Sequence, residues 1–232
     1  MIENVIAIVP AAGMGRRFGE GTHKPFATLG NRPLLAWTLL SLASVPEITE
    51  IIPVLREPDM AYGVSVLEEY RIPRVRRIAP GGRERQDSVF SGLKLIRGHG
   101  SSVLIHDGVR PLIEPAVIRK ALGGLVDCDG VVVGVPVKDT IKETAGDFVE
   151  KTLRREALWA VQTPQVFPYS TIFSAHERAM RESFCATDDA SLVERYGGKV
   201  RMVLGSYANI KITTPDDLKI AEVLLERRGT AA

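Results

Sequence analysis

The sequence predicts an α/β protein with a mostly parallel, twisted sheet and helices on both faces. Up to residue 136, short apolar runs of strand length alternate with segments of helical periodicity. The run at 131–137 is apolar almost throughout, which is typical of a strand buried on both faces of a parallel sheet. Because the chain contains no linker or low-complexity segment, we expect a single domain over residues 1–232.

The elements of the first half follow from local signals. Leucines three and four residues apart mark a helix after Pro33, and Pro58 and Pro115 stand where helices can begin, since proline is tolerated in a first turn. Asp87 or Ser88 is the expected cap of a further helix. The expected strands are 5–9, 48–55, 75–79, 103–105 and 131–137, and the expected helices are 33–44, 58–70, one from 87 or 88, and one from 115.

The alternation changes after residue 138. Residues 139–144 and 148–153 alternate polar and apolar side chains around Ala145-Gly146-Asp147, which predicts a β-hairpin within an arm at about 138–158. Because an isolated hairpin is marginal in water, we expect it to pack against something, such as a partner subunit. The remaining expected elements are helices 168–182 and 189–195, strands 199–204 and 209–213, and a final helix that starts at Thr214-Pro215.

Composition excludes several classes of protein. With 30 basic and 28 acidic residues the net charge is +2, so nothing indicates a nucleic-acid or membrane surface. No stretch approaches the about 20 apolar residues of a membrane helix, and the amino-terminal apolar run has strand length and no basic flank. Two cysteines are too few for a disulfide framework and fit a reducing compartment. We therefore expect a cytoplasmic protein.

The loop after the first strand carries the strongest functional signal. Residues 10–19 combine small residues with the adjacent cations Arg16 and Arg17, and Lys24 follows. Small residues let a backbone approach a ligand and present its N–H groups. Clustered cations favour an anion with several charges, so a nucleotide triphosphate is the obvious ligand.

Neither of two standard phosphate loops fits this segment. The spacing of the glycines at 13, 15 and 19 is one residue longer than the dinucleotide fingerprint allows. The strand 48–55 is followed by Arg56, where that fingerprint requires an acid. A Walker A loop requires Gly-Lys-Ser/Thr, whereas Lys24 follows His23. An ordinary glycine-rich turn is the simpler alternative, but it leaves the three cations unexplained.

Three polar loops, 10–25, 80–88 and 106–111, follow expected strands and can converge at one edge of the sheet. Asp107 comes just past a buried strand, where a carboxylate is a natural Mg²⁺ ligand. His106-Asp107 also allows an HD-type hydrolase or a zinc site, but the chain has only four histidines and no zinc-ligand spacing. A role for Asp107 as a helix cap fits poorly, because Arg110-Pro111 follows it so closely.

The other polar segments are weaker signals. Gly81 to Ser88 suits recognition of a base or ribose ahead of a helix, although a solvated turn explains it equally well. Alternation in 209–213 places Lys211 opposite Ile210 and Ile212, as for an ordinary solvated lysine. No Ser/His/Asp or Cys/His set is evident. The inventory therefore favours catalysis by charge neutralisation and positioning.

Together these motifs resemble the 2-C-methyl-D-erythritol 4-phosphate cytidylyltransferase family. The matching blocks run in order from about residue 5 to 225, and as a set they are far more specific than any one of them. They are Pro10-Ala11-Ala12-Gly13-Met14-Gly15-Arg16-Arg17, Gly81 to Val89, His106 to Pro111, Pro136 to Thr140, Leu158-Trp159 with Thr163-Pro164-Gln165, Thr187 to Ser191, and Asn209 to Thr213.

The resemblance implies a homodimeric, Rossmann-like nucleotidyltransferase that joins CTP to a methylerythritol phosphate and releases pyrophosphate. It implies Mg²⁺ or another divalent cation as cofactor, with CTP and a polyol phosphate as partners. The roles that it implies, position by position, are these: Arg17, Lys24 and Lys211 catalytic; Ala11, Ala12, Gly13, Gly15, Gly82, Ser88 and Gly108 at CTP; Arg110, Thr140, Arg155 and Thr163 at the acceptor, with Thr140 and Arg155 on an arm that reaches the other subunit; and Asp107 at the metal.

Three departures from the family pattern concern the substrate contacts. His23-Lys24-Pro25-Phe26 stands where Pro-Lys-Gln-Tyr is common, Arg83 where an acid is common, and Gly108-Val109 where two alanines are usual. The closest alternative function is a cytidylyltransferase for another polyol phosphate, such as ribitol 5-phosphate, which shares the CTP loops. A nucleotide-sensing module would not need Asp107 as metal ligand beside the phosphates, and glycine spacing disfavours a hydride-transferring enzyme.

Overall fold

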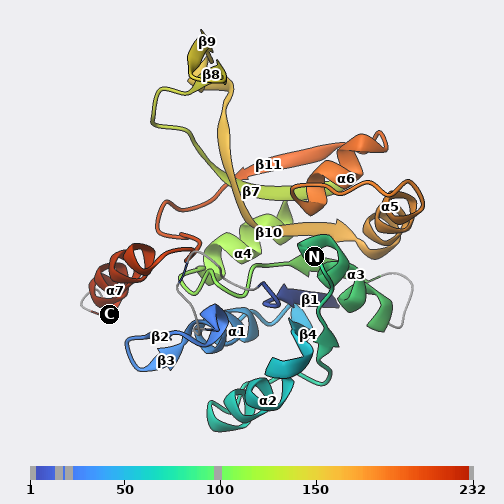
Figure 1. The fold of residues 1–232 in the computed structure, drawn as a ribbon. Helices are drawn as coiled ribbons and strands as arrows, with labels where there is room; N and C mark the ends of the chain where they lie inside the picture. The colour runs from blue at the N-terminus through green and yellow to red at the C-terminus, as the bar shows by residue number, and fades with distance from the viewer. Residues whose placement is uncertain (1–3, 14–17, 19–22, 97–100, 230–232) are drawn as a thin grey trace.

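A seven-stranded sheet forms the centre of the computed structural model, which describes residues 4–13, 18, 23–96 and 101–229. The strands lie in the order β11-β7-β10-β6-β1-β4-β5 (Figure 1). Their bounds are β1 Val5–Pro10, β4 Ile48–Leu55, β5 Ala79–Pro80, β6 Ser102–Ile105, β7 Gly130–Pro136, β10 Trp159–Pro168 and β11 Val200–Leu204.

All pairings in this sheet are parallel except those of β10, which runs antiparallel to both β6 and β7. The carboxyl ends of β1, β4, β5 and β6 therefore meet at one edge, as the alternation of strands and helices predicts. β1 lies between β4 and β6, with Ala7 opposite Ile51 on one side and Leu104 on the other. All three side chains are fully buried, in keeping with a strand covered on both faces.

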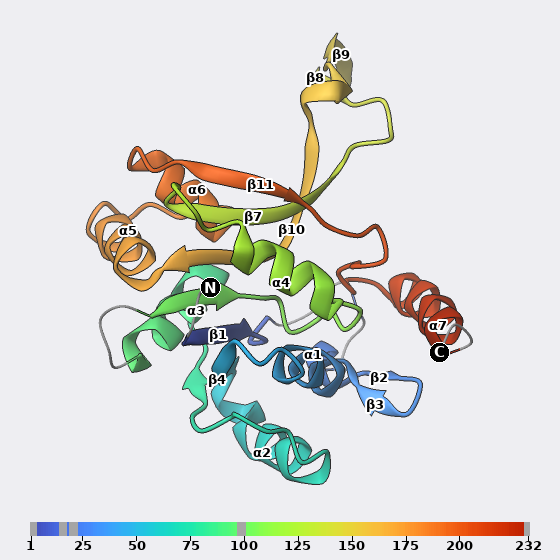
Figure 2. The same cartoon turned by 180° about the vertical axis from the view of Figure 1, so that it is seen from behind.

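The helices cover both faces of the sheet, as expected (Figure 2). The core on one face includes leucines of α1 and Ile118 of α4, with Val66 of α2. The core on the other face includes Val89 and Leu93 of α3 together with side chains of α5 and α6. The bounds are α1 Leu34–Ala43, α2 Met60–Glu69, α3 Arg85–Leu95, α4 Pro115–Gly123, α5 Tyr169–Arg181, α6 Asp189–Arg195 and α7 Pro215–Gly229; the short 3-10 helices are η1 Lys24–Phe26, η2 Glu57–Asp59 and η3 Arg155–Ala157.

The last helix, α7, packs beside the sheet edge that carries the polar loops. Its Ala221 joins a third core with Leu29 and Leu34, next to the small sheet of β2 (Thr28–Leu29) and β3 (Arg32–Pro33). The predicted start of α7 is confirmed, since the Thr214 hydroxyl accepts a hydrogen bond from the Asp217 N–H at 3.3 Å. None of the helices among the described residues is long and apolar enough to cross a membrane.

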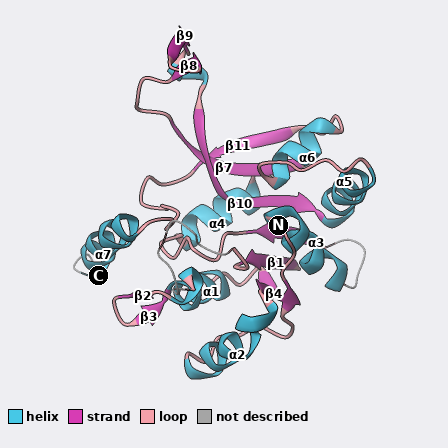
Figure 3. Cartoon of the chain, in the orientation of Figure 1, coloured by secondary structure: helices cyan, strands magenta, loops and turns pink. Residues whose placement is uncertain are grey.

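The predicted hairpin projects from the body of the molecule as an arm (Figure 3). Its strands are β8, Lys142–Ala145, and β9, Phe148–Thr152, and they pair antiparallel. Gly146 occupies the turn at φ +56°, a conformation that glycine adopts readily. Every residue of both strands is exposed, so the hairpin stands clear of the cores that the structure describes.

Four sequence predictions differ from the structure. The strand at 75–79 shortens to Ala79–Pro80 with an isolated bridge at Val75, and the helix at 58–70 opens as a 3-10 turn. The helix predicted from Asp87 or Ser88 begins at Arg85, because Glu84 and Asp87 form a capping box. Residues 209–213 form no strand, and the Ile212 N–H links them to the neighbouring loop by donating to Val109 O at 2.9 Å. The long antiparallel strand β10 was not predicted.

Candidate active site

The three polar loops converge on one cavity of about 690 Å³, as predicted for the part of them that the structure describes. The cavity opens at the carboxyl ends of β1, β4, β5 and β6. Lys24 and Lys211 line it from opposite ends of the sequence, with Asp107 beside them. Its lining residues are Pro10, Ala11, Ala12, Gly13, Lys24, Pro25, Arg56, Gly82, Arg83, Glu84, Arg85, Ser88, Asp107, Val109 and Lys211.

The loop before α3 is shaped by its own hydrogen bonds. The Ser88 hydroxyl accepts from the Gly82 N–H and donates to Glu84 O, both at 3.1 Å. A Cβ at Gly82 would lie 2.2 Å from the Cβ of Asp87, so no other residue fits this turn without movement. The turn therefore holds backbone groups and the buried Ser88 at the cavity wall, where a base or ribose could be read.

Asp107 is the electrostatic centre of the site. Its Oδ1 accepts from Arg85 Nε at 3.1 Å, while its Oδ2 accepts from Arg110 Nε at 3.3 Å and lies 3.0 Å from Lys211 Nζ. The carboxylate is buried, whereas the side chains of Lys211 and Arg85 are 39% and 28% exposed. The simpler interpretation of Lys211 as an ordinary strand lysine does not hold, because residues 209–213 are not a strand and the partly exposed ammonium pairs with Asp107.

The pKa values in this cluster follow from burial and charge. Burial alone would raise the pKa of Asp107, but Arg85, Lys211 and Arg110 together hold it well below its ordinary value. Burial opposes the charge of Arg85, yet Asp189 and Asp107 raise its pKa above the ordinary value. Burial lowers the pKa of Arg110. Asp107 is therefore a carboxylate, ready to hold cations.

A second cavity, of about 460 Å³, adjoins the first and shares Arg85, Asp107 and Lys211 with it. Arg110 and Thr163, both predicted at the acceptor, line this second cavity and are buried. The remaining lining residues are Val161, Gln162, Gln165, Thr187, Asp188, Ser191 and Glu194. Two cavities that meet at one charged cluster suit a reaction between two bound substrates.

Hydrogen bonds beneath the cluster fix its shape. The Thr163 hydroxyl accepts from the Asp107 N–H at 3.1 Å and lies 3.0 Å from His106 Nδ1. Because the Arg110 carbonyl can only accept, His106 Nε2 donates to it at 3.3 Å, and Nδ1 of the neutral ring accepts from the Thr163 hydroxyl. Burial, with Arg110 nearby, lowers the pKa of His106 to about 4 despite Asp107. The imidazole supports the loop with both of its ring nitrogens, which are thereby engaged inside the protein.

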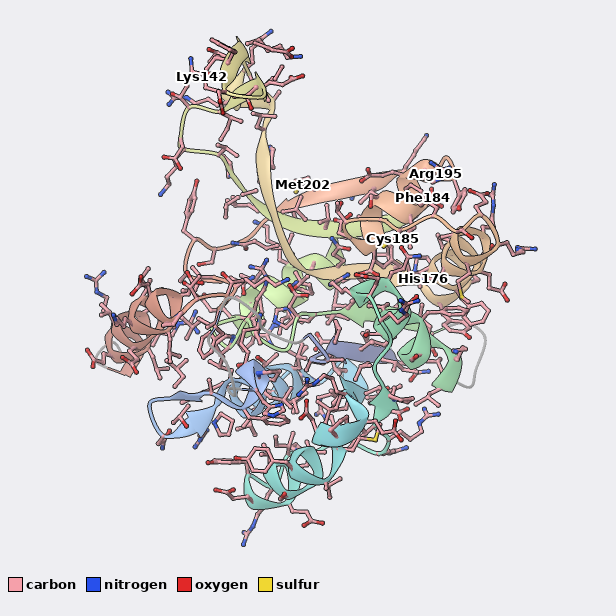
Figure 4. The ribbon with its side chains drawn as sticks, in the orientation of Figure 1. Lys142, His176, Phe184, Cys185, Arg195 and Met202 are labelled. Carbon is pink, nitrogen blue, oxygen red and sulfur yellow. The ribbon has the colours of Figure 1, made fainter. Side chains whose placement is uncertain are left out.

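The structure does not bring every predicted residue to the cavities. Thr140 and Arg155 are exposed on the arm, where Arg155 Nη1 donates to Lys138 O at 3.2 Å. Figure 4 marks the same arm by Lys142. The backbone N–H of Gly108 donates to Pro10 O, and its C=O accepts from a side chain of α1, so these groups are already used. Gly15 and Arg17 lie outside the described residues.

Sequence reasoning missed two cations and one acid. Arg85 bridges Asp107 and Asp189, and its Nη1 lies 2.6 Å from Asp189 Oδ2. Arg56 lines the nucleotide-sized cavity and donates to Asp59 from Nε at 2.7 Å. For both cations the signal in the sequence was their position. Arg85 lies in the polar loop 80–88, which was expected at the ligand-binding edge of the sheet, and Arg56 directly follows the strand 48–55. Asp189 lies in the block Thr187 to Ser191 that carries the family resemblance, but the resemblance implied no role for it.

The donor set fits a metal ion only as a companion of a phosphate ligand. Among the described residues no three His, Cys, Asp or Glu side chains cluster as a ligand set. Asp107 offers one ionised carboxylate that lines both cavities. Mg²⁺ commonly takes one or two carboxylates and completes its shell with water and substrate phosphates. These residues therefore fit a magnesium ion that binds together with a polyphosphate.

Known protein sequences match this chain over nearly its whole length. A family model for 2-C-methyl-D-erythritol 4-phosphate cytidylyltransferase (IspD) matches residues 5–227. The 2-C-methyl-D-erythritol 4-phosphate cytidylyltransferase of Geotalea uraniireducens is 45% identical over 225 residues, covering 96% of this chain and 97% of that protein. The protein of the same name from Syntrophotalea carbinolica is 43% identical over 228 residues, covering 97% and 98%.

Solved structures agree with these sequence matches. The 4-diphosphocytidyl-2C-methyl-D-erythritol synthase of Anaerococcus prevotii superposes with a TM-score of 0.86 at 34% identity, over 97% of this chain and 96% of that one. The 2-C-methyl-D-erythritol 4-phosphate cytidylyltransferase of Thermus thermophilus gives a TM-score of 0.77 at 31% identity, over 97% and 98%. The likeness thus extends along nearly the whole length of both partners.

Proposed function

Since the chain belongs to the 2-C-methyl-D-erythritol 4-phosphate cytidylyltransferase family, and therefore transfers a cytidylyl group from CTP to 2-C-methyl-D-erythritol 4-phosphate, we propose that its two adjoining cavities bind these two substrates. One observation carries the proposal: both cavities are lined by Arg85, Asp107 and Lys211, so two ligands would meet at a single charged cluster.

CTP is assigned to the larger cavity. Ala11, Ala12 and Gly13 approach it with small side chains or none, and Gly82 with Ser88 supplies polar groups suited to the cytosine. The triphosphate extends toward Lys24 and Lys211. Arg17, with Gly15 beside it in the sequence, is assigned to the phosphates by its place in the family motif.

The acceptor phosphate is assigned to the second cavity, with Arg110 and Thr163 as its contacts. An acceptor oxygen attacks the α-phosphorus of CTP, and the bond from that phosphorus to the pyrophosphate oxygen breaks. Because the nucleophile is already an anion, no side chain has to remove a proton. The protein instead holds both phosphates in line and neutralises the charge that builds on the equatorial oxygens, which is the task of Lys24, Arg17 and Lys211.

Asp107 is the residue that would hold Mg²⁺ in this site. When bound, the ion supplies charge neutralisation for the departing pyrophosphate. Arg85, Lys211 and Arg110 lower the pKa of Asp107 and so favour the ionised carboxylate, the form that binds a cation.

The arm is assigned to a homodimer contact in a cytoplasmic enzyme. Phe148 and Val149 on the arm are 81% and 59% exposed, and Trp159 and Val161 at its base are also open. Apolar side chains gathered in this way are typical of a covered surface. A second subunit would cover them, and its reach would bring Thr140 and Arg155 of one chain to the acceptor cavity of the other.

The test measures pyrophosphate release with CTP and Mg²⁺ against a panel of polyol phosphates. Turnover with 2-C-methyl-D-erythritol 4-phosphate and not with ribitol 5-phosphate is the expected result, and the named relatives do not favour the second acceptor. Turnover with ribitol 5-phosphate alone would overturn the acceptor assignment. Sedimentation of the protein as a monomer at assay concentration would overturn the shared site.

A further inference from the structure

A row of four hydrogen-bonded side chains leads from the protein core to Asp107. His176 Nε2 donates to Asp189 Oδ1 at 3.2 Å. Arg85 donates from Nη1 to Asp189 Oδ2 at 2.6 Å and from Nε to Asp107 Oδ1 at 3.1 Å. The four residues come from α5, α6, α3 and the loop after β6, and Figure 4 marks the inner end of the row at His176.

Arg85 occupies a position that is unfavourable for a cation. It is the first residue of α3, where the helix dipole disfavours positive charge. Two carboxylates, Asp107 and Asp189, offset this disadvantage and grip the guanidinium from two sides. Such a double clamp fixes the orientation of the planar group, which a single ion pair would not do.

The inner end of the row is also costly for stability. His176 is fully buried and Asp189 is 1% exposed. Among the described residues, Nδ1 of His176 has no hydrogen-bond partner, and a buried unpaired polar atom costs about 1–3 kcal/mol. The imidazole lies parallel to the ring of Phe90 at 5.8 Å, a space that an apolar side chain would fill without that cost. The His176–Asp189 bond therefore calls for a functional explanation.

Arg85 lies where the two cavities meet. It lines both of them, and its side chain remains 28% exposed. Among the residues that the structure describes, its side-chain hydrogen bonds use only Nε and Nη1. Nη2 is thus available to a ligand at the junction, next to Asp107 and Lys211.

We propose that Arg85 is a further catalytic residue that contacts the phosphate being transferred, and that Asp189, supported by His176, is the residue that positions it. The proposal rests on the substrate placement given under the proposed function. Arg85 transfers no proton; its charge stabilises the equatorial oxygens while the new bond to the α-phosphorus forms and the bond to pyrophosphate breaks. Asp189 acts only through Arg85.

The test compares single and double variants in pyrophosphate release. Arg85→Ala is expected to lower kcat by about 10²–10³-fold, the range for losing one electrostatic stabiliser. Asp189→Asn should lower kcat by about 10²-fold through misplacement of the guanidinium, with a smaller change in the KM for CTP. Because both act through one group, the double variant should be no slower than Arg85→Ala alone.

Glu182→Gln is the matched control. Glu182 also joins the end of α5 to α6, by accepting from Tyr196 at 3.0 Å, but it does not reach Arg85, so kcat should stay at the wild-type value. Asp189→Glu, which keeps the carboxylate, should retain more activity than Asp189→Asn. If circular dichroism shows that Asp189→Asn does not fold, Asp189→Glu still tests the proposal.

Two outcomes would overturn the inference while the wild-type enzyme is active. One is a double variant whose loss equals the product of the two single losses, which would mean that Asp189 acts independently of Arg85. The other is an Arg85→Ala variant with near-normal kcat. A wild-type protein that releases no pyrophosphate from CTP and 2-C-methyl-D-erythritol 4-phosphate would instead refute the proposed function, so the two failures are distinguishable.

Discussion

Replacing His106 by glutamine should flatten the acid side of the stability curve. In the folded protein, burial lowers the pKa of His106 from 6.5 to about 4. The unfolded chain therefore binds a proton below about pH 6.5, which the folded protein does not bind until about pH 4. Stability rises with pH wherever the unfolded state binds more protons, so the wild-type protein loses stability as the pH falls through this window.

The magnitude follows from the same two values. One pKa unit corresponds to about 1.4 kcal/mol, so the change from 6.5 to about 4 amounts to about 3 kcal/mol of unfolding free energy at the acid end. The carboxylates Asp107 and Asp189 also have lowered pKa values, and in the unfolded chain they take up protons mainly near and below about pH 4. Because the wild-type protein and His106→Gln both keep these carboxylates, the difference between the two stability curves reports His106.

The assay is urea unfolding, followed by circular dichroism at closely spaced pH values from 7 to 4, in buffer with EDTA. His106→Gln should lose about 3 kcal/mol less than wild type across that range. Thr163→Ser is the control, because it keeps the hydroxyl that donates to His106 Nδ1 and should keep the wild-type slope. Parallel curves for wild type and His106→Gln would refute the reasoning, since His106 would then titrate alike in both states.

Three further predictions concern activity. Lys24→Ala should lower kcat for pyrophosphate release by about 10²–10³-fold, and near-normal turnover would remove Lys24 from the catalytic set. Arg110→Ala and Arg155→Ala should each be impaired in acceptor use, and mixing the two should partly restore activity if subunits share the site; absence of rescue would speak against sharing. Gly82→Ala should destabilise the protein by about 1–3 kcal/mol, because its Cβ would lie 2.2 Å from that of Asp87, and should weaken CTP binding; an unchanged calorimetric Kd would contradict this.

The fold was predictable where local pattern and tertiary structure agree. The apolar run of β4 predicted its bounds, Ile48–Leu55, without error, and the alternation of strands and helices predicted where the polar loops meet. Prediction failed where distant contacts decide. Residues 209–213 alternate like a strand, yet the Ile212 N–H donates to Val109 O and the Ile212 side chain packs in the core with Ala221 of α7. The neighbouring Lys211 forms an ion pair with Asp107.

The site was predictable in its parts and not in its connections. The motif around Asp107 indicated a carboxylate at a strand end, and Arg85 lay in a loop with expected polar function. Their link to Asp189 depends on how α3, α5 and α6 pack on one face of the sheet, and no short-range signal encodes that packing. The error in the start of α3 hid the same link, because the capping box at Glu84 makes Arg85 the first helical residue and turns it toward Asp107.

The arrangement of charges suggests why a site for polyanions is built around a carboxylate. Arg85, Arg110 and Lys211 would repel one another if they stood together without an anion. Asp107 lies within 3.3 Å of all three, so it holds them in place before any phosphate arrives. Preorganised cations need no rearrangement at the moment of reaction, which is the condition for strong electrostatic catalysis. In the proposed site, Asp107 would therefore contribute to phosphate binding as the organiser of the cations, independently of any metal ion that it would hold.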